Sequence, residues 1–174
     1  MKALIIEDNA DVVEAISLCL QTRWPDVTIS SSALGFNGVE KVKSLSLDII
    51  ILDLNLPDID GLEVLRQIRS FSSLPIIIVT VRGEEDDQAK GLEMGADDYI
   101  VKPFRPRDLI ARVNSVLRRS RLSEVAFGLG ISIAKYILEL QQGKTGFESK
   151  AMKGNNSIFS TSTLGQNLRE PDDQ

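Results

Sequence analysis

Residues 48–53 read Asp48-Ile49-Ile50-Ile51-Leu52-Asp53, a run of large apolar side chains between two aspartates. An apolar run without alternation is typical of a strand that is buried on both faces. Such strands occur in parallel sheets that helices cover on both sides. The stretch therefore predicts a central strand of an α/β fold, with Asp53 at its carboxyl end.

Similar short apolar runs occur elsewhere in the chain, and helical patterns separate them. The other expected strands cover residues 3–6, 27–31, 76–79 and 99–101. Apolar residues recur at helical spacing between and after them, which predicts helices near residues 9–20, 38–45, 62–68, 83–94 and 106–119. Strands and helices that alternate in this way predict a parallel, doubly wound sheet with right-handed crossovers.

Polar residues stand where the expected strands end: Glu7, Asp8, Asp53, Thr80 and Lys102. Ligands of open α/β sheets bind at the carboxyl ends of the strands. Clustered carboxylates repel one another, and their oxygen atoms suit a hard cation, of which Mg²⁺ also pairs with phosphate. A carboxylate can then act as the nucleophile toward a phosphoryl donor, while an ammonium and a hydroxyl stabilise the phosphoryl oxygens. The pattern predicts carboxyl phosphorylation; the alternative is that each residue is an ordinary loop residue or helix cap.

Composition excludes several other kinds of chemistry. The 174 residues are 43% hydrophobic and 26% charged, with a net charge of −5, no histidine and one cysteine. The chain cannot use histidine in catalysis, metal binding or phosphotransfer, and Cys19 cannot form a disulfide within it. An acidic chain is a poor candidate for binding nucleic acid by charge alone. Without a long apolar stretch, we expect a cytoplasmic protein with no membrane contact.

Three segments resemble the receiver domains of two-component response regulators. They are Ile5-Ile6-Glu7-Asp8-Asn9, the stretch from Asp48 to Gly61 (DIIILDLNLPDIDG), and the stretch from Gly95 to Phe104 (GADDYIVKPF). The resemblance covers about residues 1–119 and implies a flavodoxin-like sheet of five parallel strands in the order 2-1-3-4-5. The resemblance implies a signalling protein that accepts a phosphoryl group rather than an enzyme, and kinase activity is not expected because the chain has no histidine to phosphorylate.

The resemblance also implies roles for individual residues. Asp53 would accept the phosphoryl group, and Lys102 and Thr80 would contact it. Thr80 and Tyr99 would form the switch pair, in which the hydroxyl moves toward the phosphoryl group and the ring turns inward. The residues implied as Mg²⁺ ligands are Glu7, Asp8, Asp53 and, through its backbone carbonyl, Asn55.

Residues 80–87 and 91–99 are most similar to the winged-helix class of transcription factors, in which charged faces pair two receivers. The charged residues available for a homodimer through the fourth helix, fifth strand and fifth helix are Glu85, Asp86, Asp87, Lys90, Asp97, Arg112 and Arg119. A solvated charged face is the alternative. The residues after Arg119 show no helix-turn-helix pattern, so DNA binding is not expected.

Residues 120–165 do not resemble a receiver domain. The run from Phe127 to Leu140 (FGLGISIAKYILEL) resembles the second glycine box and following helix of a histidine-kinase ATP-binding domain, and residues 143–164 resemble its β-hairpin. The asparagine helix and the Asp-Gly-Gly box of that domain are absent, so ATP binding is not expected. We expect a small α+β appendage that mediates protein contacts or dimerisation, then a disordered tail at residues 166–174.

The sequence thus predicts a response regulator that a partner histidine kinase phosphorylates on Asp53 with Mg²⁺, and that signals through altered protein contacts. One alternative is a DNA-binding transcriptional regulator. Another is a phosphate sink without an output partner.

Overall fold

The structure is a computed structural model that describes residues 1–122. Its elements are β1 (Lys2–Ile6), α1 (Ala10–Arg23), β2 (Thr28–Ser32), α2 (Gly35–Ser44), β3 (Ile49–Leu52), α3 (Gly61–Arg69), β4 (Ile76–Thr80), α4 (Glu85–Glu93) and β5 (Asp98–Val101). A further helix begins at residue 106 and includes residue 122. Within this part of the chain, no helix is long and apolar enough to cross a membrane.

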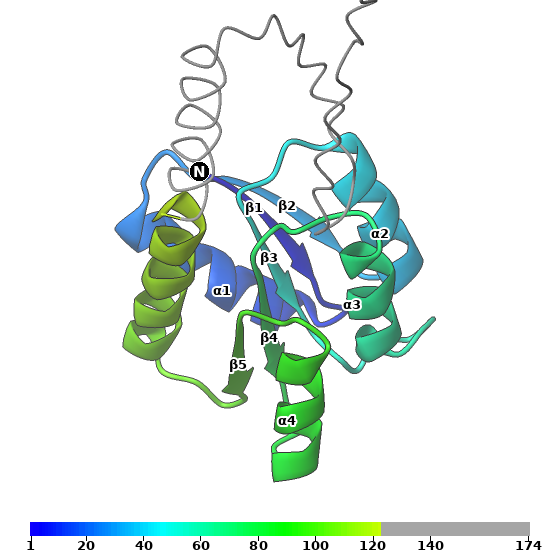
Figure 1. Ribbon diagram of the computed structural model, residues 1–174. Coiled ribbons are helices and arrows are strands. Elements are labelled where there is room, and N and C mark those ends of the chain that lie inside the picture. The colour runs from blue at the N-terminus through cyan, green and yellow to red at the C-terminus, as the bar shows by residue number, and fades with distance from the viewer. Residues whose placement is uncertain (123–174) are drawn as a thin grey trace, which may run out of the picture.

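The five strands form one parallel sheet in the order β2-β1-β3-β4-β5 (Figure 1). This confirms the predicted fold and strand order. The register pairs Ile6 of β1 with both Ser32 of β2 and Leu52 of β3. The residues that follow β1 and β3 therefore emerge side by side at the carboxyl edge of the sheet.

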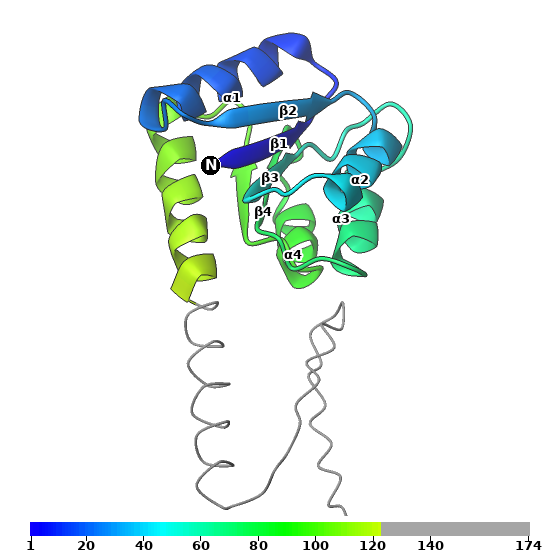
Figure 2. The same ribbon diagram turned by 90° about the horizontal axis from the view of Figure 1, so that it is seen from above.

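Helices cover both faces of the sheet. Figure 1 shows α2, α3 and α4 on one side, with α1 and the helix of residues 106–122 on the other, and Figure 2 shows the same layers from above. Side chains alternate along a strand, so Leu4 and Ile6 pack in the first layer while Ala3 and Ile5 pack in the second. The apolar runs are uninterrupted because both faces are buried.

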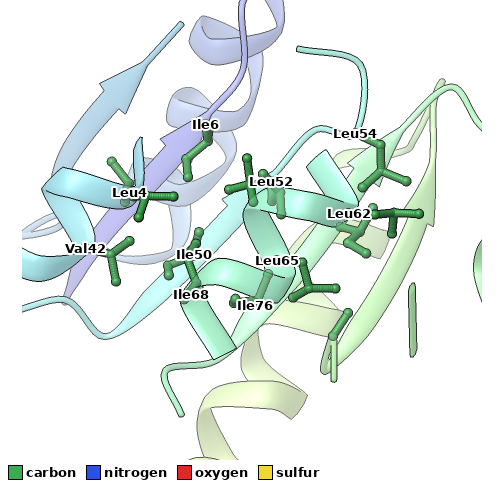
Figure 3. Packing of buried hydrophobic residues seen from close by; sticks show 14 of the residues in the cluster. Leu4, Ile6, Val42, Ile50, Leu52, Leu54, Leu62, Leu65, Ile68 and Ile76 are labelled. Atoms are coloured by element: carbon green, nitrogen blue, oxygen red, sulfur yellow. The ribbon is translucent and has the colours of Figure 1, made fainter. Parts of the chain in front are cut away.

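The first layer contains the larger apolar cluster (Figure 3). There Leu62, Leu65 and Ile68 of α3 point toward Ile50 and Leu52 of β3 and toward Ile76 of β4, and each of these six side chains is buried. Burial of each such aliphatic side chain contributes roughly 1.5–3 kcal/mol. This packing holds α3, and with it the loop that carries Asp53, against the sheet.

Helix α2 begins three residues earlier than the apolar pattern predicted. Its N-cap residue Leu34 offers no side-chain cap. Instead, the carboxylate of Asp58, on the loop after β3, accepts hydrogen bonds from the backbone amides of Gly35 (2.8 Å) and Phe36 (3.0 Å). These bonds hold the pKa of Asp58 below its usual range, against the opposing effect of burial. A cap supplied from a distant loop leaves no local sequence signal.

The expected appendage and tail, residues 120–165 and 166–174, lie outside the described residues apart from residues 120–122, which belong to the last helix. Those predictions stay predictions.

Gly61 provides a test of how tightly the Asp53 loop packs. Its amide donates to the carbonyl of Leu54 (2.9 Å), and a Cβ there would collide with the carbonyl oxygen of Asp53 and lie 2.5 Å from the Cα of Leu54. We expect Gly61→Ala to lower the free energy of unfolding by about 3 kcal/mol, because backbone atoms cannot move aside as side chains do. Urea denaturation measures the effect.

The matched control is Gly83→Ala, whose new Cβ would come nearest to a side-chain methyl group of Val101, at 3.2 Å, and would meet backbone only at ordinary contact distance, 4.0 Å from the carbonyl oxygen of Val81. Equal losses of stability in the two variants would contradict the packing described for Gly61.

Candidate functional site

Three carboxylates meet at the carboxyl ends of β1 and β3. Carboxylate oxygens of Glu7, Asp8 and Asp53 all lie within 4.8 Å of one another. The strand register explains this, since the amide of Asp53 donates to the carbonyl of Ile6 (2.9 Å). Glu7 and Asp53 are buried, with 4% and 5% of their surface exposed, whereas Asp8 is exposed.

Lys102 brings a positive charge into the cluster. Its Nζ donates to Glu7 Oε2 (2.5 Å) and to Asp53 Oδ2 (2.8 Å), and its side chain is 12% exposed. Lys102 follows β5, which is separated from β3 by β4. The three members of this ion triad therefore come from three different strand ends.

Burial and charge oppose each other in the triad. Burial raises the pKa of Glu7, and the neighbouring Asp53 adds to the rise, although Lys102 acts against both. Burial alone would lower the pKa of Lys102, but its hydrogen bonds to Asp53 and Glu7 outweigh that effect and raise it. The ammonium group is thus held charged by the two carboxylates that it neutralises.

Asn55 and Thr80 also lie at this edge of the sheet. The amide of Asn55 donates to Asp53 Oδ1 (3.2 Å), so Lys102 and Asn55 contact different oxygens of the same carboxylate. Thr80, at the end of β4, is fully buried, and its Oγ1 accepts a hydrogen bond from the backbone amide of Arg82 (3.4 Å).

Tyr99 lies in β5 with its ring buried. Its hydroxyl donates to the backbone carbonyl of Arg82 (2.9 Å) rather than pointing into water. Burial raises the pKa of Tyr99 above its ordinary value of 10.0, so the hydroxyl is a protonated donor at neutral pH with or without this rise. Thr80 and Tyr99 therefore hold the same residue, one through its amide and the other through its carbonyl.

No sequence motif indicated a role in the site for Arg82 or Asp60. The Arg82 guanidinium donates through Nε to Asn55 Oδ1 (2.7 Å) and through Nη2 to Asp60 Oδ2 (2.7 Å). The other oxygen of Asp60 caps α3 by accepting from the amide of Leu62 (2.8 Å). An aspartate before a helix is a recognisable cap signal, but no sequence pattern reports its partnership with Arg82.

The chemistry of the donors fits a hard divalent cation. Every candidate side-chain ligand in the cluster is a carboxylate oxygen, which is the kind of ligand that Mg²⁺ and Ca²⁺ prefer. When all are ionised, three carboxylates and one ammonium carry a net charge of −2. A divalent cation would cancel that charge, so the residues present fit the predicted metal.

A family model for the response regulator receiver domain matches residues 3–114. The chain belongs to this family. The sequence-based prediction of a receiver domain is therefore confirmed, and the predicted site residues lie in the matched region.

Curated relatives agree with this assignment. The chain is 44% identical over 134 residues to the response regulator ArlR of Staphylococcus saprophyticus, an alignment that covers 77% of this chain and 60% of that protein. It is 45% identical over 132 residues to ArlR of Staphylococcus epidermidis, covering 76% and 59%. The chain thus spans about three fifths of the length of these relatives.

Solved structures show the same fold. The BeF3-activated receiver domain of Klebsiella pneumoniae RstA is 30% identical with a TM-score of 0.64, covering 68% of this chain and 99% of that one. A two-component response regulator from Clostridium difficile is 29% identical with a TM-score of 0.65, covering 69% and 98%. These matches are to response regulators and do not support the kinase-like resemblance of residues 120–165.

Removal of Lys102 should make stability depend more strongly on pH than it does in the wild type. Lys102→Met takes away the group that lowers the pKa of Glu7, so the folded-state pKa of Glu7 rises further above its ordinary value of 4.5. A carboxyl group with a raised folded-state pKa stabilises the fold below its unfolded pKa, and that stability is lost as pH rises through the folded-state pKa. We expect a loss of about 3 kcal/mol near neutral pH that shrinks toward pH 4.5.

Chemical denaturation at several pH values, in buffer containing EDTA, measures this loss. The control is Lys43→Met, which removes a lysine whose partner Glu40 is exposed, and its effect on stability should be small because exposed ion pairs contribute little. A loss for Lys102→Met that stays constant with pH would contradict the electrostatic account.

Proposed function

We propose that this protein is a phosphorylation-controlled signalling protein that accepts a phosphoryl group on Asp53 from a partner sensor histidine kinase in the cytoplasm. The observation that carries the proposal is the ion triad. One oxygen of the buried Asp53 carboxylate is held by the Lys102 ammonium (2.8 Å), beside two further carboxylates. Membership of the receiver family supports the same role.

The transfer needs a nucleophile and groups that stabilise the negative charge of the phosphoryl oxygens. A carboxylate oxygen of Asp53 forms a bond to phosphorus while the bond from phosphorus to the donor's leaving atom breaks, and that atom takes up a proton. Lys102 stays beside the acyl phosphate and neutralises part of its charge. The protein itself is the acceptor in this step, so it does not turn over a substrate as an enzyme does.

Glu7, Asp8 and Asp53 would hold Mg²⁺ through their side chains, and Asn55 through its backbone carbonyl. When bound, the ion supplies charge neutralisation between the carboxylates and the incoming phosphoryl oxygens. Asp8 is exposed, so its carboxylate would bind the ion on the solvent side of the site. Glu7 and Asp53 would bind it on the buried side.

Thr80 and Tyr99 would form the switch pair. The Thr80 hydroxyl turns to donate to the phosphoryl group, and the Tyr99 ring, which is already buried here, holds its inward position as the segment after β4 rearranges. A phosphoryl group that forms new contacts in only one conformation shifts a two-state equilibrium toward that conformation.

Phosphorylation gives the first test. With a small phosphoryl donor and Mg²⁺, the full chain should gain the mass of one phosphoryl group, and Asp53→Asn should gain none because an amide cannot form the acyl phosphate. EDTA should suppress the gain. Intact-protein mass spectrometry makes the measurement, and equal gains in the wild type and Asp53→Asn would refute the assignment of the acceptor.

The output surface is the face formed by α4, β5 and the helix of residues 106–122, as the similarity to winged-helix-class receivers suggests. Arg112 Nη1 already pairs with Asp98 Oδ1 (2.5 Å), and Asp97 pairs with Arg69 (3.0 Å). Glu85, Asp86 and Lys90 are exposed, as is the apolar side chain of Leu92. This mixture of charged and apolar groups suits pairing with a second copy of the chain.

Leu92→Glu tests that surface. Leu92 is exposed in the single chain, so a charge there should leave folding and phosphorylation intact while it prevents apolar contact between two copies. We expect phosphorylation to shift the wild type from monomer toward dimer in sedimentation, and the variant to remain monomeric. A variant that still dimerises on phosphorylation would place the interface elsewhere, with the segment after residue 119 as the next candidate.

A further inference from the structure

Gly91 lies inside α4, where a glycine is an unfavourable residue. Glycine loses more backbone entropy in a helix than alanine does. Gly91 is nevertheless at the position that faces the sheet, since it is buried while its neighbours Lys90 and Leu92 are exposed. A helix normally presents an apolar side chain at such a position. The reason for a glycine must therefore lie in its contacts.

The space that a side chain would need at Gly91 is already filled. A Cβ there would lie 2.8 Å from Cδ1 of Ile78 and 3.2 Å from two ring carbons of Tyr99, Cδ2 and Cε2. Ile78 of β4 and Tyr99 of β5 are paired in the sheet register and belong to the same buried cluster. The backbone of α4 therefore packs directly on the Tyr99 ring.

Hydrogen bonds hold α4 in place at this point. The carbonyl of Gly91 accepts from the amide of Ala96 (3.0 Å), and the carbonyl of Leu92 accepts from the amide of Gly95 (3.0 Å). These bonds join the end of α4 to the turn that leads into β5, the strand that carries Tyr99. A shift of α4 away from the sheet would break them, so a side chain at position 91 would displace the ring instead.

The far end of the ring reaches the segment after β4. There the Tyr99 hydroxyl donates to the carbonyl of Arg82 (2.9 Å). A ring that is displaced from α4 would lose this bond as well as its burial. The ring is thus fixed at one edge by the backbone of α4 and at its hydroxyl by the segment after β4.

We propose that the missing side chain at Gly91 is what allows the Tyr99 ring to occupy its buried position, so that Gly91 positions one member of the switch pair. This inference rests on the proposed function and deepens it, since it identifies the part of α4 on which the inward position of the ring depends. Gly91 is a positioning residue, because it acts through Tyr99.

Gly91→Val tests the proposal. The valine side chain needs the space in which Ile78 and Tyr99 now lie, so the ring should move out toward solvent. If phosphorylation requires the inward ring, fewer molecules are then ready to bind a phosphoryl mimic. We expect the variant to bind beryllofluoride with Mg²⁺ roughly tenfold more weakly than the wild type.

Gly91→Ala is a milder change. Alanine favours a helix more than glycine does, and its Cβ requires the ring to move by only a few tenths of an ångström. We expect roughly a twofold loss of affinity for beryllofluoride. Addition of Ile78→Val removes Cδ1, the atom nearest to the new Cβ, so the methyl group can lie against β4 rather than against the ring. Because this pair of changes conserves volume, the double variant should return to the affinity of the wild type.

The matched control is Ala89→Val, at an exposed position of the same helix. It introduces the same β-branched residue, with its lower helix propensity, on a side of α4 that does not face the ring. Its affinity for beryllofluoride should equal that of the wild type.

The position of the ring can be measured directly. The chain has two tyrosines, Tyr99 and Tyr136, so 3-fluorotyrosine labelling gives two ¹⁹F signals, and Tyr136→Phe assigns them. The ¹⁹F shift of an exposed ring changes when H₂O is replaced by D₂O, whereas that of a buried ring changes little. We expect a small change for Tyr99 in the wild type and in Ala89→Val, and a larger change in Gly91→Val.

A wild type that binds beryllofluoride, together with a folded Gly91→Val that keeps either a shielded Tyr99 ring or full affinity, would overturn this inference alone. If circular dichroism shows that Gly91→Val is unfolded, Gly91→Ala decides: wild-type affinity in this variant, or no recovery when Ile78→Val is added, would overturn the inference. A wild type that binds no beryllofluoride would overturn the proposed function, and this inference with it.

Discussion

The ammonium group of Lys102 lies between the buried carboxylates of Glu7 and Asp53, and much of the structure is needed to keep it there. Burial of a carboxylate without a counter-charge costs several kcal/mol of folding free energy. Lys102 must therefore be buried together with Glu7 and Asp53. They follow β5, β1 and β3, which are brought to one edge by a parallel sheet with β4 as the spacer. The site is therefore complete only in the folded sheet, because its three groups lie far apart in the sequence.

The sheet and the acidic cluster could be predicted from the sequence because both follow from local rules. The apolar runs mark strands buried on both faces, and the parallel topology places whatever follows each strand at one edge. The position of Asp53 and the convergence of Glu7, Asp8 and Lys102 followed from those two facts. The boundaries of the strands and helices were predicted to within a few residues.

The features that sequence reasoning missed depend on contacts between distant segments. Asp58 determines where α2 begins, although 23 positions separate it from Gly35. Arg82 reaches Asp60 across the site, and the Tyr99 hydroxyl finds a backbone carbonyl 17 positions away. None of these partners has a fixed spacing or a required residue type. Only the folded chain shows which polar side chains meet.

The loop between β3 and α3 also has a mechanical asymmetry. Asp58 fastens it to the start of α2, Asp60 fastens it to the start of α3, and Gly61 packs against its backbone. The loop after β4 is anchored differently: the N-cap Glu84 of α4 makes no side-chain cap, and instead the side chain of Gln88 in α4 donates to the carbonyl of Gly83 (2.9 Å). The loop after β3 is therefore fixed by carboxylates at the starts of two helices, whereas the loop after β4 is fixed to its own helix by a single neutral side chain.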